Sequence, residues 1–176
     1  MCDQQISTRI KTDRLVLRPP QVSDAVDLAC LIDRKVAQMT AGAPYPASKS
    51  TVEAFLVRIR EEGPKRHRVL LITSGDDEPM GLVGFHHKAG AIFELGYWLG
   101  AGFRGRGVAT EAVTAAMVWA RDVWGMRVAA SGHFVDNPAS GRVLEKAGFL
   151  YTGVVEPQFS VGRDCEVETR LMIWLA

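Results

Sequence analysis

The chain has 176 residues, 47% of them hydrophobic, and its 21 basic residues nearly balance its 20 acidic ones to give a net charge of +1. This length suits one domain with a core of its own, so we expect residues 1–176 to form a single domain. The balanced charge argues against nucleic acid held by bulk charge, and no apolar run approaches the ~20 residues that cross a membrane.

The first third of the chain predicts one strand and two helices. Residues 14–18 alternate in polarity and stop at a proline pair, which is typical of a strand. Ser23 and Asp24 can cap a helix over the apolar positions that follow them. Residues 34–49 contain a glycine and two prolines and are expected to be a loop. A Ser-Thr-Val-Glu capping box then opens a second helix over residues 50–59.

The middle of the chain predicts three strands and a long helix. Residues 69–73 form a short apolar run that is expected to be a buried strand. Residues 80–87 and 92–99 are expected to pair as a hairpin across a Lys-Ala-Gly turn. A glycine-rich turn follows, and residues 110–124 then show the periodicity of a helix, which a glycine ends.

The last third predicts another strand, a short helix and two final strands. Residues 128–135 form the strand, and the Asn-Pro pair at 137–138 provides a cap and a first position for the helix. The final strands cover residues 149–155 and 167–175, with a polar connection at 156–166. This order predicts a mixed α+β fold and not a regular βαβ alternation.

The most informative feature is the glycine-rich turn at residues 103–110, which lies between a predicted strand and a predicted helix. Gly105 and Gly107 let the backbone approach a bulky anion, and the first amides of a helix have no partner within it. Arg104 and Arg106 add positive charge and forked donors. We therefore expect a phosphorylated ligand at this turn.

Two common phosphate-binding motifs do not fit this turn. A P-loop needs a lysine followed by serine or threonine at the start of the helix, and no lysine stands there. A dinucleotide-binding fingerprint needs an acid at the end of the next strand, and Asp136 comes too late and directly precedes another helix cap. Several predicted strands also precede the turn, so it does not belong to a first βα unit.

A third class of phosphate binder does fit. Arg104-x-x-Gly107-x-Ala109 matches the Gln/Arg-x-x-Gly-x-Gly/Ala signature of the GNAT superfamily of N-acetyltransferases. The Asn-x-x-Ser…Gly-Phe segment at 137–149 resembles that family's second motif, and segments 12–19 and 93–99 resemble its Rim-type subgroup, the ribosomal-protein N-terminal acetyltransferases. The resemblance implies a mostly antiparallel twisted sheet of about seven strands with about four helices, in which strands 92–99 and 128–135 splay apart to hold acetyl-CoA.

The resemblance also implies which residues bind acetyl-CoA. Backbone groups of Trp98, Leu99 and Gly100 are expected to pair with the pantetheine amides, as an added strand does. The amides of the turn are expected to hold the pyrophosphate; they belong to Arg104, Gly105, Arg106, Gly107, Val108, Ala109 and Thr110. Asn137 is expected to cap its helix and to contact pantetheine, and Ser140 is also expected to bind acetyl-CoA.

Two residues are the catalytic candidates. Glu94 is an acid within an apolar strand, and alternation places it on one face with Gly96 and Trp98. Such surroundings can raise a carboxyl pKa and suit a base that deprotonates the acceptor amine, although an exposed or arginine-paired glutamate is an equal alternative. Glu156 is a second candidate for the base. Many members of the family have a tyrosine in the second motif that protonates the leaving thiolate. The resemblance places a leucine, Leu144, at that position.

Ser140 is the other catalytic candidate, because Rim-type relatives suggest this serine as the proton donor to the leaving thiolate. It also lies in the first turn of a predicted helix, where a serine can simply bond to the backbone. A backbone N–H of the strand around Tyr97 and Trp98 is the candidate donor to the thioester oxygen.

The acceptor and the setting stay open. The acceptor is either a protein N-terminus or a small-molecule amine, and segments 34–49 and 156–166 are expected to decide which. A non-catalytic acyl-CoA-binding or sensing module is the alternative to an enzyme. Three distant cysteines, Cys2, Cys30 and Cys165, show no metal or disulfide spacing, and residues 1–5 lack the apolar core of a secretory signal. We therefore expect a cytoplasmic monomer or homodimer without a metal, nucleic acid or membrane partner.

Overall fold

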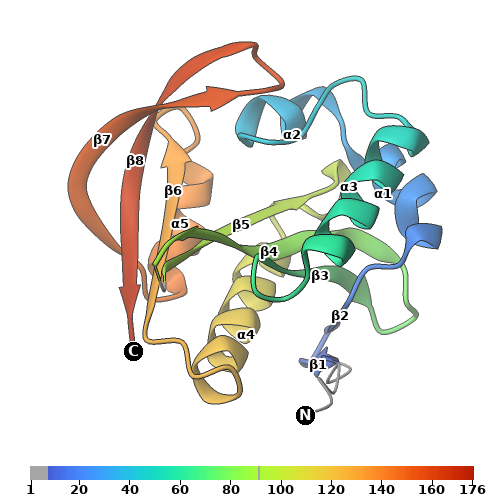
Figure 1. Cartoon of the computed structure of the whole chain (residues 1–176), viewed down its shortest axis with the longest axis horizontal. Coiled ribbons are helices and arrows are strands. Elements are labelled where there is room, and N and C mark those ends of the chain that lie inside the picture. Colours follow the sequence, from blue (N-terminus) through green and yellow to red (C-terminus); the bar gives the residue numbers. More distant parts are fainter. Residues whose placement is uncertain (1–7, 91) are drawn as a thin grey trace.

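The computed structural model describes residues 8–90 and 92–176, and over these residues it forms one eight-stranded sheet (Figure 1). The spatial order is β1-β2-β3-β4-β5-β6-β8-β7, and all neighbours are antiparallel except the parallel pair of β5 and β6. The strands are β1 (Ile10–Lys11), β2 (Leu15–Arg18), β3 (His67–Ser74), β4 (Pro79–Ala89), β5 (Ile92–Leu99), β6 (Val128–Phe134), β7 (Leu150–Ser160) and β8 (Cys165–Leu175). Cys2 lies outside the described residues.

Helices cover both faces of the sheet, because alternate strand residues point to opposite sides. The described residues form five α-helices: α1 (Ala25–Leu31), α2 (Arg34–Met39), α3 (Lys49–Glu62), α4 (Val108–Asp122) and α5 (Pro138–Lys146). On one face, α1 and α3 pack on Val69, Leu71 and Leu82. On the other face, α4 and α5 bury the larger core, which includes Leu70 and Phe85. The predicted α+β class with a mostly antiparallel sheet is confirmed, with one strand and one helix more than expected.

The predicted hairpin and the two helix starts beside the site are present. β4 and β5 pair from Gly81↔Leu99 to Ala89↔Ile92, as expected for a hairpin. The long helix starts slightly earlier than predicted, at Val108. At α5, the Asn137 side chain accepts a hydrogen bond from the Ser140 amide at 3.4 Å, and Pro138 occupies the first turn.

Three local predictions are wrong. Segment 34–49 is not all loop: it contains α2, whose cap is the Asp33 carboxylate, 2.7 Å from the Val36 amide. The capping box of α3 is formed by Ser48 and Thr51, two residues before the predicted start. Segment 156–166 is mostly strand, because β7 and β8 continue to pair as far as Ser160↔Cys165.

Asp24 does not cap α1 with its side chain; its carboxylate instead completes the capping box of a short 3-10 helix, Val22–Asp24. The carboxylate is 8% exposed and accepts hydrogen bonds at 2.9 Å from both terminal nitrogens of Arg18 and at 2.6 Å from the Gln21 amide. Burial raises the pKa of Asp24, but these hydrogen bonds outweigh it and hold the pKa below its usual value. The pair ties β2 to the start of α1.

Replacing Asp24 with asparagine should therefore destabilise the fold. At pH 7 we expect the free energy of unfolding to fall by about 3 kcal/mol, because the Arg18 guanidinium loses its more buried carboxylate partner and keeps only the exposed Asp77, 2.9 Å away. A carboxyl whose folded pKa is depressed stabilises the fold above its unfolded pKa, near 3.8, and this contribution is lost as the pH falls through the lower folded pKa. Urea titrations at pH 7 and pH 3 measure both effects. Asp76→Asn, at an exposed turn, is the control, and equal losses in both variants would contradict the prediction.

Candidate active site

The site begins where β5 and β6 separate. The two parallel strands pair only at Phe93↔Ala129 and Glu94↔Ala130, and the Ser131 hydroxyl donates to the Leu95 carbonyl at 2.9 Å just beyond. After that point the strands part, so one edge of β5 faces a gap within the sheet. A gap of this kind offers unpaired backbone groups to an extended ligand.

Alternation along β5 decides which backbone groups face the gap. The Gly100 amide donates to the Met80 carbonyl of β4 at 2.9 Å, and a side chain on Gly81 would meet the Trp98 carbonyl. Because antiparallel pairing alternates, Trp98 and Gly100 point their backbone groups at β4, while Tyr97 and Leu99 point theirs at the gap. Of the three backbones predicted to pair with pantetheine, only Leu99 is so placed, and Tyr97 joins it.

The glycine-rich turn has the geometry that the sequence predicts for an anion cradle. Gly105 and Gly107 have φ values of +73° and +78°, which side-chain-bearing residues rarely adopt. The first hydrogen bond of α4 runs from the Glu111 amide to the Gly107 carbonyl, so the amides of the first turn have no partner within the helix. Those residues, Val108, Ala109 and Thr110, line a cavity of about 470 Å³, which we call the turn cavity.

The two arginines of the turn do not point at the ligand as expected. Arg104 lines the turn cavity, but its guanidinium binds Asp33 at 2.8 Å and the Leu99 carbonyl at 2.9 Å. The Arg106 guanidinium donates to the Gly102 carbonyl at 3.3 Å, and Arg106 is not among the lining residues. Both side chains therefore brace the turn.

Other cations line the turn cavity instead. Lys35 from α2 and Arg142 and Lys146 from α5 surround the cradle. Sequence reasoning missed all three, although the four-residue spacing of Arg142 and Lys146 puts them on one helix face. Lys35 was hidden because its segment was predicted to be a loop. Together the three side chains supply the positive charge that a multiply phosphorylated ligand requires.

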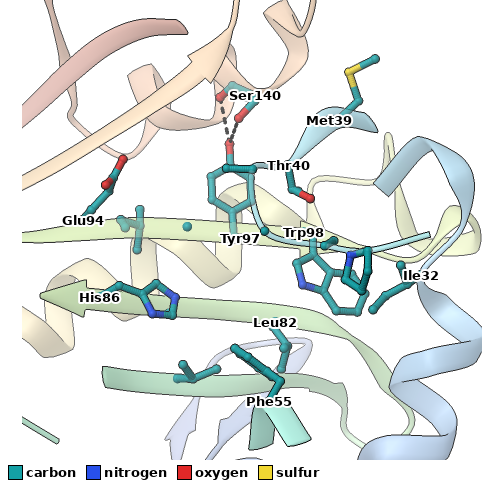
Figure 2. A pocket seen from close by; sticks show the side chains of 18 of the residues that line it. Ile32, Met39, Thr40, Phe55, Leu82, His86, Glu94, Tyr97, Trp98 and Ser140 are labelled. Carbon is teal, nitrogen blue, oxygen red and sulfur yellow. Dashed lines mark hydrogen bonds between the residues drawn. The ribbon is translucent and has the colours of Figure 1, made fainter. Parts of the chain in front are cut away.

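A second cavity of about 440 Å³ lies on the α1–α3 side of the gap, and we call it the sheet cavity (Figure 2). Its wall is largely apolar, with Phe55, Leu82 and Trp98 prominent. The two cavities share five lining residues: Met39, Thr40, Tyr97, Trp98 and Ser140. A ligand in the turn cavity and a ligand in the sheet cavity would therefore meet at these side chains.

A hydroxyl pair stands at this junction. The Tyr97 hydroxyl lies 2.7 Å from Ser140 Oγ and donates to the Ser140 carbonyl at 2.9 Å (Figure 2). Burial raises the pKa of Tyr97 above its usual range, against the opposing effect of the Ser140 hydrogen bond, so the phenol stays protonated. Leu144, which the resemblance places at the family's tyrosine position, is fully buried in the core. Sequence reasoning named Tyr97 only for its backbone and missed its hydroxyl, because the partner Ser140 is 43 residues away.

Glu94 lines the sheet cavity, where it is the only acid among the described lining residues. Its carboxylate lies 3.4 Å from the Lys88 ammonium, and the side chain is 29% exposed. The partner is thus a lysine of β4 and not the arginine considered above. Glu156, the second candidate for the base, is exposed on β7 and lines neither cavity, so the structure removes it from the site.

The two segments expected to control the acceptor touch each other (Figure 1). The Val161 amide donates to the Ala41 carbonyl at 2.9 Å, and Arg163 Nε donates to the Gln38 carbonyl at 2.6 Å. The side-chain nitrogen of Asn137, Nδ2, at the start of α5, donates to the Met39 carbonyl at 3.4 Å. These bonds join the tip of the β7–β8 hairpin and the start of α5 to the end of α2, beside the junction of the two cavities.

Metal and membrane features are absent from the part of the chain that the structure describes. No group of three or more histidine, cysteine or acidic side chains is placed to hold a metal ion there. None of its helices combines the length and the apolar character needed to cross a bilayer.

Comparison with known proteins identifies the fold. An acetyltransferase (GNAT) domain model matches residues 14–150, whereas no curated protein matches the chain. RimL, a ribosomal L7/L12 alpha-N-protein acetyltransferase solved with coenzyme A, is 19% identical, with a TM-score of 0.82 over 96% of this chain and 98% of that one. The ribosomal-protein-S5-alanine acetyltransferase of Vibrio fischeri is 16% identical, with a TM-score of 0.81 over 96% of each chain.

The microcin C7 self-immunity acetyltransferase MccE, solved with acetyl-CoA and AMP, is 21% identical, with a TM-score of 0.80 over 94% of each chain. At these identities the solved structures share the fold, and the family model carries the assignment. That model spans most of the chain and includes both the glycine-rich turn and the Asn137 motif. The chain belongs to the GNAT family of acetyltransferases.

Proposed function

We propose that this enzyme acetylates the primary amine of a small molecule with an apolar body, and that the acceptor occupies the sheet cavity. The observation that carries the proposal is the junction of the two cavities at Tyr97, Trp98 and Ser140. An acyl donor in one cavity and an amine in the other meet there. Acetyl-CoA supplies a thioester, whose carbonyl carbon is open to attack by an uncharged amine.

The residues of the turn cavity fit coenzyme A. The free amides of Val108, Ala109 and Thr110 suit a pyrophosphate, and the surrounding lysines and arginine balance its charge. The gap-facing backbone of Tyr97 and Leu99 suits the amides of pantetheine, and one of these N–H groups is our candidate donor to the thioester oxygen. We propose that Ser140, hydrogen-bonded to Tyr97, passes a proton to the leaving sulfur.

A small acceptor is favoured over a polypeptide for two reasons. The segment that contains α2 and the tip of the β7–β8 hairpin are hydrogen-bonded to each other. This contact restricts the access of a long polypeptide to the point where the two cavities meet. The wall of the sheet cavity is formed largely by side chains such as Phe55 and Leu82, which suit an apolar body. Rim-type structures share the fold but act on ribosomal proteins, so a peptide N-terminus is the alternative acceptor.

A panel of acceptors tests this proposal. Thiol release from acetyl-CoA would be followed with 2-phenylethylamine, spermidine and peptides that begin with alanine or serine. We expect 2-phenylethylamine to give the highest kcat/KM. A peptide as the best substrate would refute the choice of acceptor, and tight coenzyme A binding without release by any amine would favour the sensing module.

We propose that the Glu94 carboxylate binds the ammonium group of the acceptor. The sequence also predicts that it acts as the base that deprotonates this group, and one substitution tests both roles. Glu94→Gln keeps the shape and removes the charge, so we expect kcat/KM for the amine to fall about 100-fold and the limb of the pH–rate profile due to this carboxyl to disappear. Glu168→Gln, on the exposed face of β8, is the control. A Glu94→Gln enzyme with the wild-type rate and pH profile would remove Glu94 from both roles.

The cytoplasmic location and the choice between monomer and homodimer stay predictions. Cys30 and Cys165 are free and exposed, which suits a reducing compartment.

A further inference from the structure

Three side chains from α3, β3 and β4 form a hydrogen-bonded chain that ends in the sheet cavity. Glu62 Oε2 lies 2.7 Å from His67 Nε2, and His67 Nδ1 lies 2.8 Å from His86 Nδ1. His67 and His86 are direct partners in the β3–β4 ladder, so their rings share one face of the sheet. Glu62 is at the surface, whereas His86 lines the sheet cavity.

The acid at one end sets the direction of this chain. The hydrogen bond from His67 lowers the pKa of Glu62, so its carboxylate can only accept a hydrogen bond. A neutral His67 must then carry its hydrogen on Nε2 and accept at Nδ1. His86 must donate from Nδ1, and its Nε2 is left with a free lone pair.

The surroundings of His86 keep it neutral and direct this lone pair at the cavity. Burial is the largest cause that lowers the pKa of His86, to about 4. Nε2 lies above Gly84, another lining residue, where a side chain would come within 3.2 Å of it. On β5 the residue directly opposite is Glu94, and both residues line the sheet cavity (Figure 2).

We propose that Glu62 and His67 hold His86 in the tautomer whose Nε2 accepts a hydrogen bond from the acceptor's amine group, in the cavity that Glu94 also lines. This inference rests on the proposed function and names the groups that select the acceptor. An ammonium group has only hydrogens to offer, so a lone pair and a carboxylate suit it. The opposite tautomer would present an N–H to the same group and repel it.

A substitution at Glu62, the surface end, should reverse the direction of the Glu62–His67–His86 hydrogen bonds without changing a residue of the cavity. In Glu62→Lys the ammonium can only donate, so His67 Nε2 must accept, His67 Nδ1 must donate, and His86 must carry its hydrogen on Nε2. At pH 8 we expect the KM for the fastest amine of the panel to rise about tenfold, the equivalent of one hydrogen bond, with kcat nearly unchanged.

Two variants on the same helix end serve as controls. Glu61→Lys makes the same change of charge at an exposed residue outside the chain, and its KM should stay at the wild-type value. In Glu62→Gln the amide oxygen can still accept from His67, so a KM near the wild-type value is expected. An equal rise in KM for Glu61→Lys and Glu62→Lys would assign the effect to charge alone and overturn the proposal.

The tautomer itself is read from nitrogen chemical shifts. In ¹⁵N-histidine-labelled protein at pH 8, we expect His86 to carry its hydrogen on Nδ1 in the wild type and on Nε2 in Glu62→Lys. A wild-type His86 with its hydrogen on Nε2 would overturn the inference, and so would a reversed tautomer with an unchanged KM. This measurement needs no turnover. It therefore distinguishes an error in the proposed function from an error in the proposed hydrogen-bond directions of Glu62, His67 and His86.

Discussion

Gly107→Val is expected to weaken coenzyme A binding by at least about 100-fold, or about 2.7 kcal/mol. A β-branched residue at a φ of +78° is strained, and relief of that strain moves the amides at the start of α4. The new side chain would also lie 3.4 Å from the Arg14 guanidinium, which donates to the Arg106 carbonyl and so braces the turn. Calorimetric titration with coenzyme A measures the loss.

The matching control lies at the other end of the same helix. Gly125 has a φ of +76° and open space around it, and it lines neither cavity. Gly125→Val should therefore cost a similar amount of stability and leave the Kd of coenzyme A unchanged. Wild-type affinity in a folded Gly107→Val protein would show that the pyrophosphate is held elsewhere.

Ser140→Ala is expected to lower kcat about 100-fold while the KM for acetyl-CoA changes little. The substitution leaves the backbone of α5 intact but removes the hydroxyl at the junction of the cavities, together with the partner of Tyr97 at 2.7 Å. If Ser140 donates the proton to the leaving sulfur, the loss falls on the chemical step. Single-turnover rates with saturating acetyl-CoA measure that step directly.

Tyr97→Phe separates the two hydroxyls. It removes the phenol that contacts Ser140 but keeps the ring, so we expect a smaller loss in kcat than in Ser140→Ala if the serine is the donor. An opposite order would assign the proton to Tyr97. Ser74→Ala, at a turn outside both cavities, controls for the loss of a serine hydroxyl, and an unaltered kcat in Ser140→Ala would leave that serine with a structural role only.

Features that depend on neighbours in the sequence were predicted correctly. The cradle needs two glycines directly before a helix, and the start of α5 needs an asparagine followed by a proline, so both are visible in a short stretch of chain. The apolar alternation of residues 80–99 likewise predicts the hairpin of β4 and β5. These local patterns were enough to suggest the family and the class of ligand.

Features that depend on distant partners were not predictable in this way. Helix α2 looked like a loop, and residues 156–160 looked like a connection until the pairing of β7 with β8 was known. The guanidinium of Arg104 was expected at a phosphate, but Asp33, 71 residues earlier, binds it. A sequence pattern lists the charges present and leaves open which of them pair.

The sequence by itself therefore indicated the GNAT family, the class of the acyl donor and the turn that we propose for its phosphates, because the motifs that suggest them lie in short stretches of chain. Only the tertiary structure decided what surrounds the acceptor. Tyr97 meets Ser140 from β5 to α5, and Glu62, His67 and His86 meet from α3 to β3 and β4. Such contacts arise when the sheet and its helices pack, and no short-range pattern encodes them.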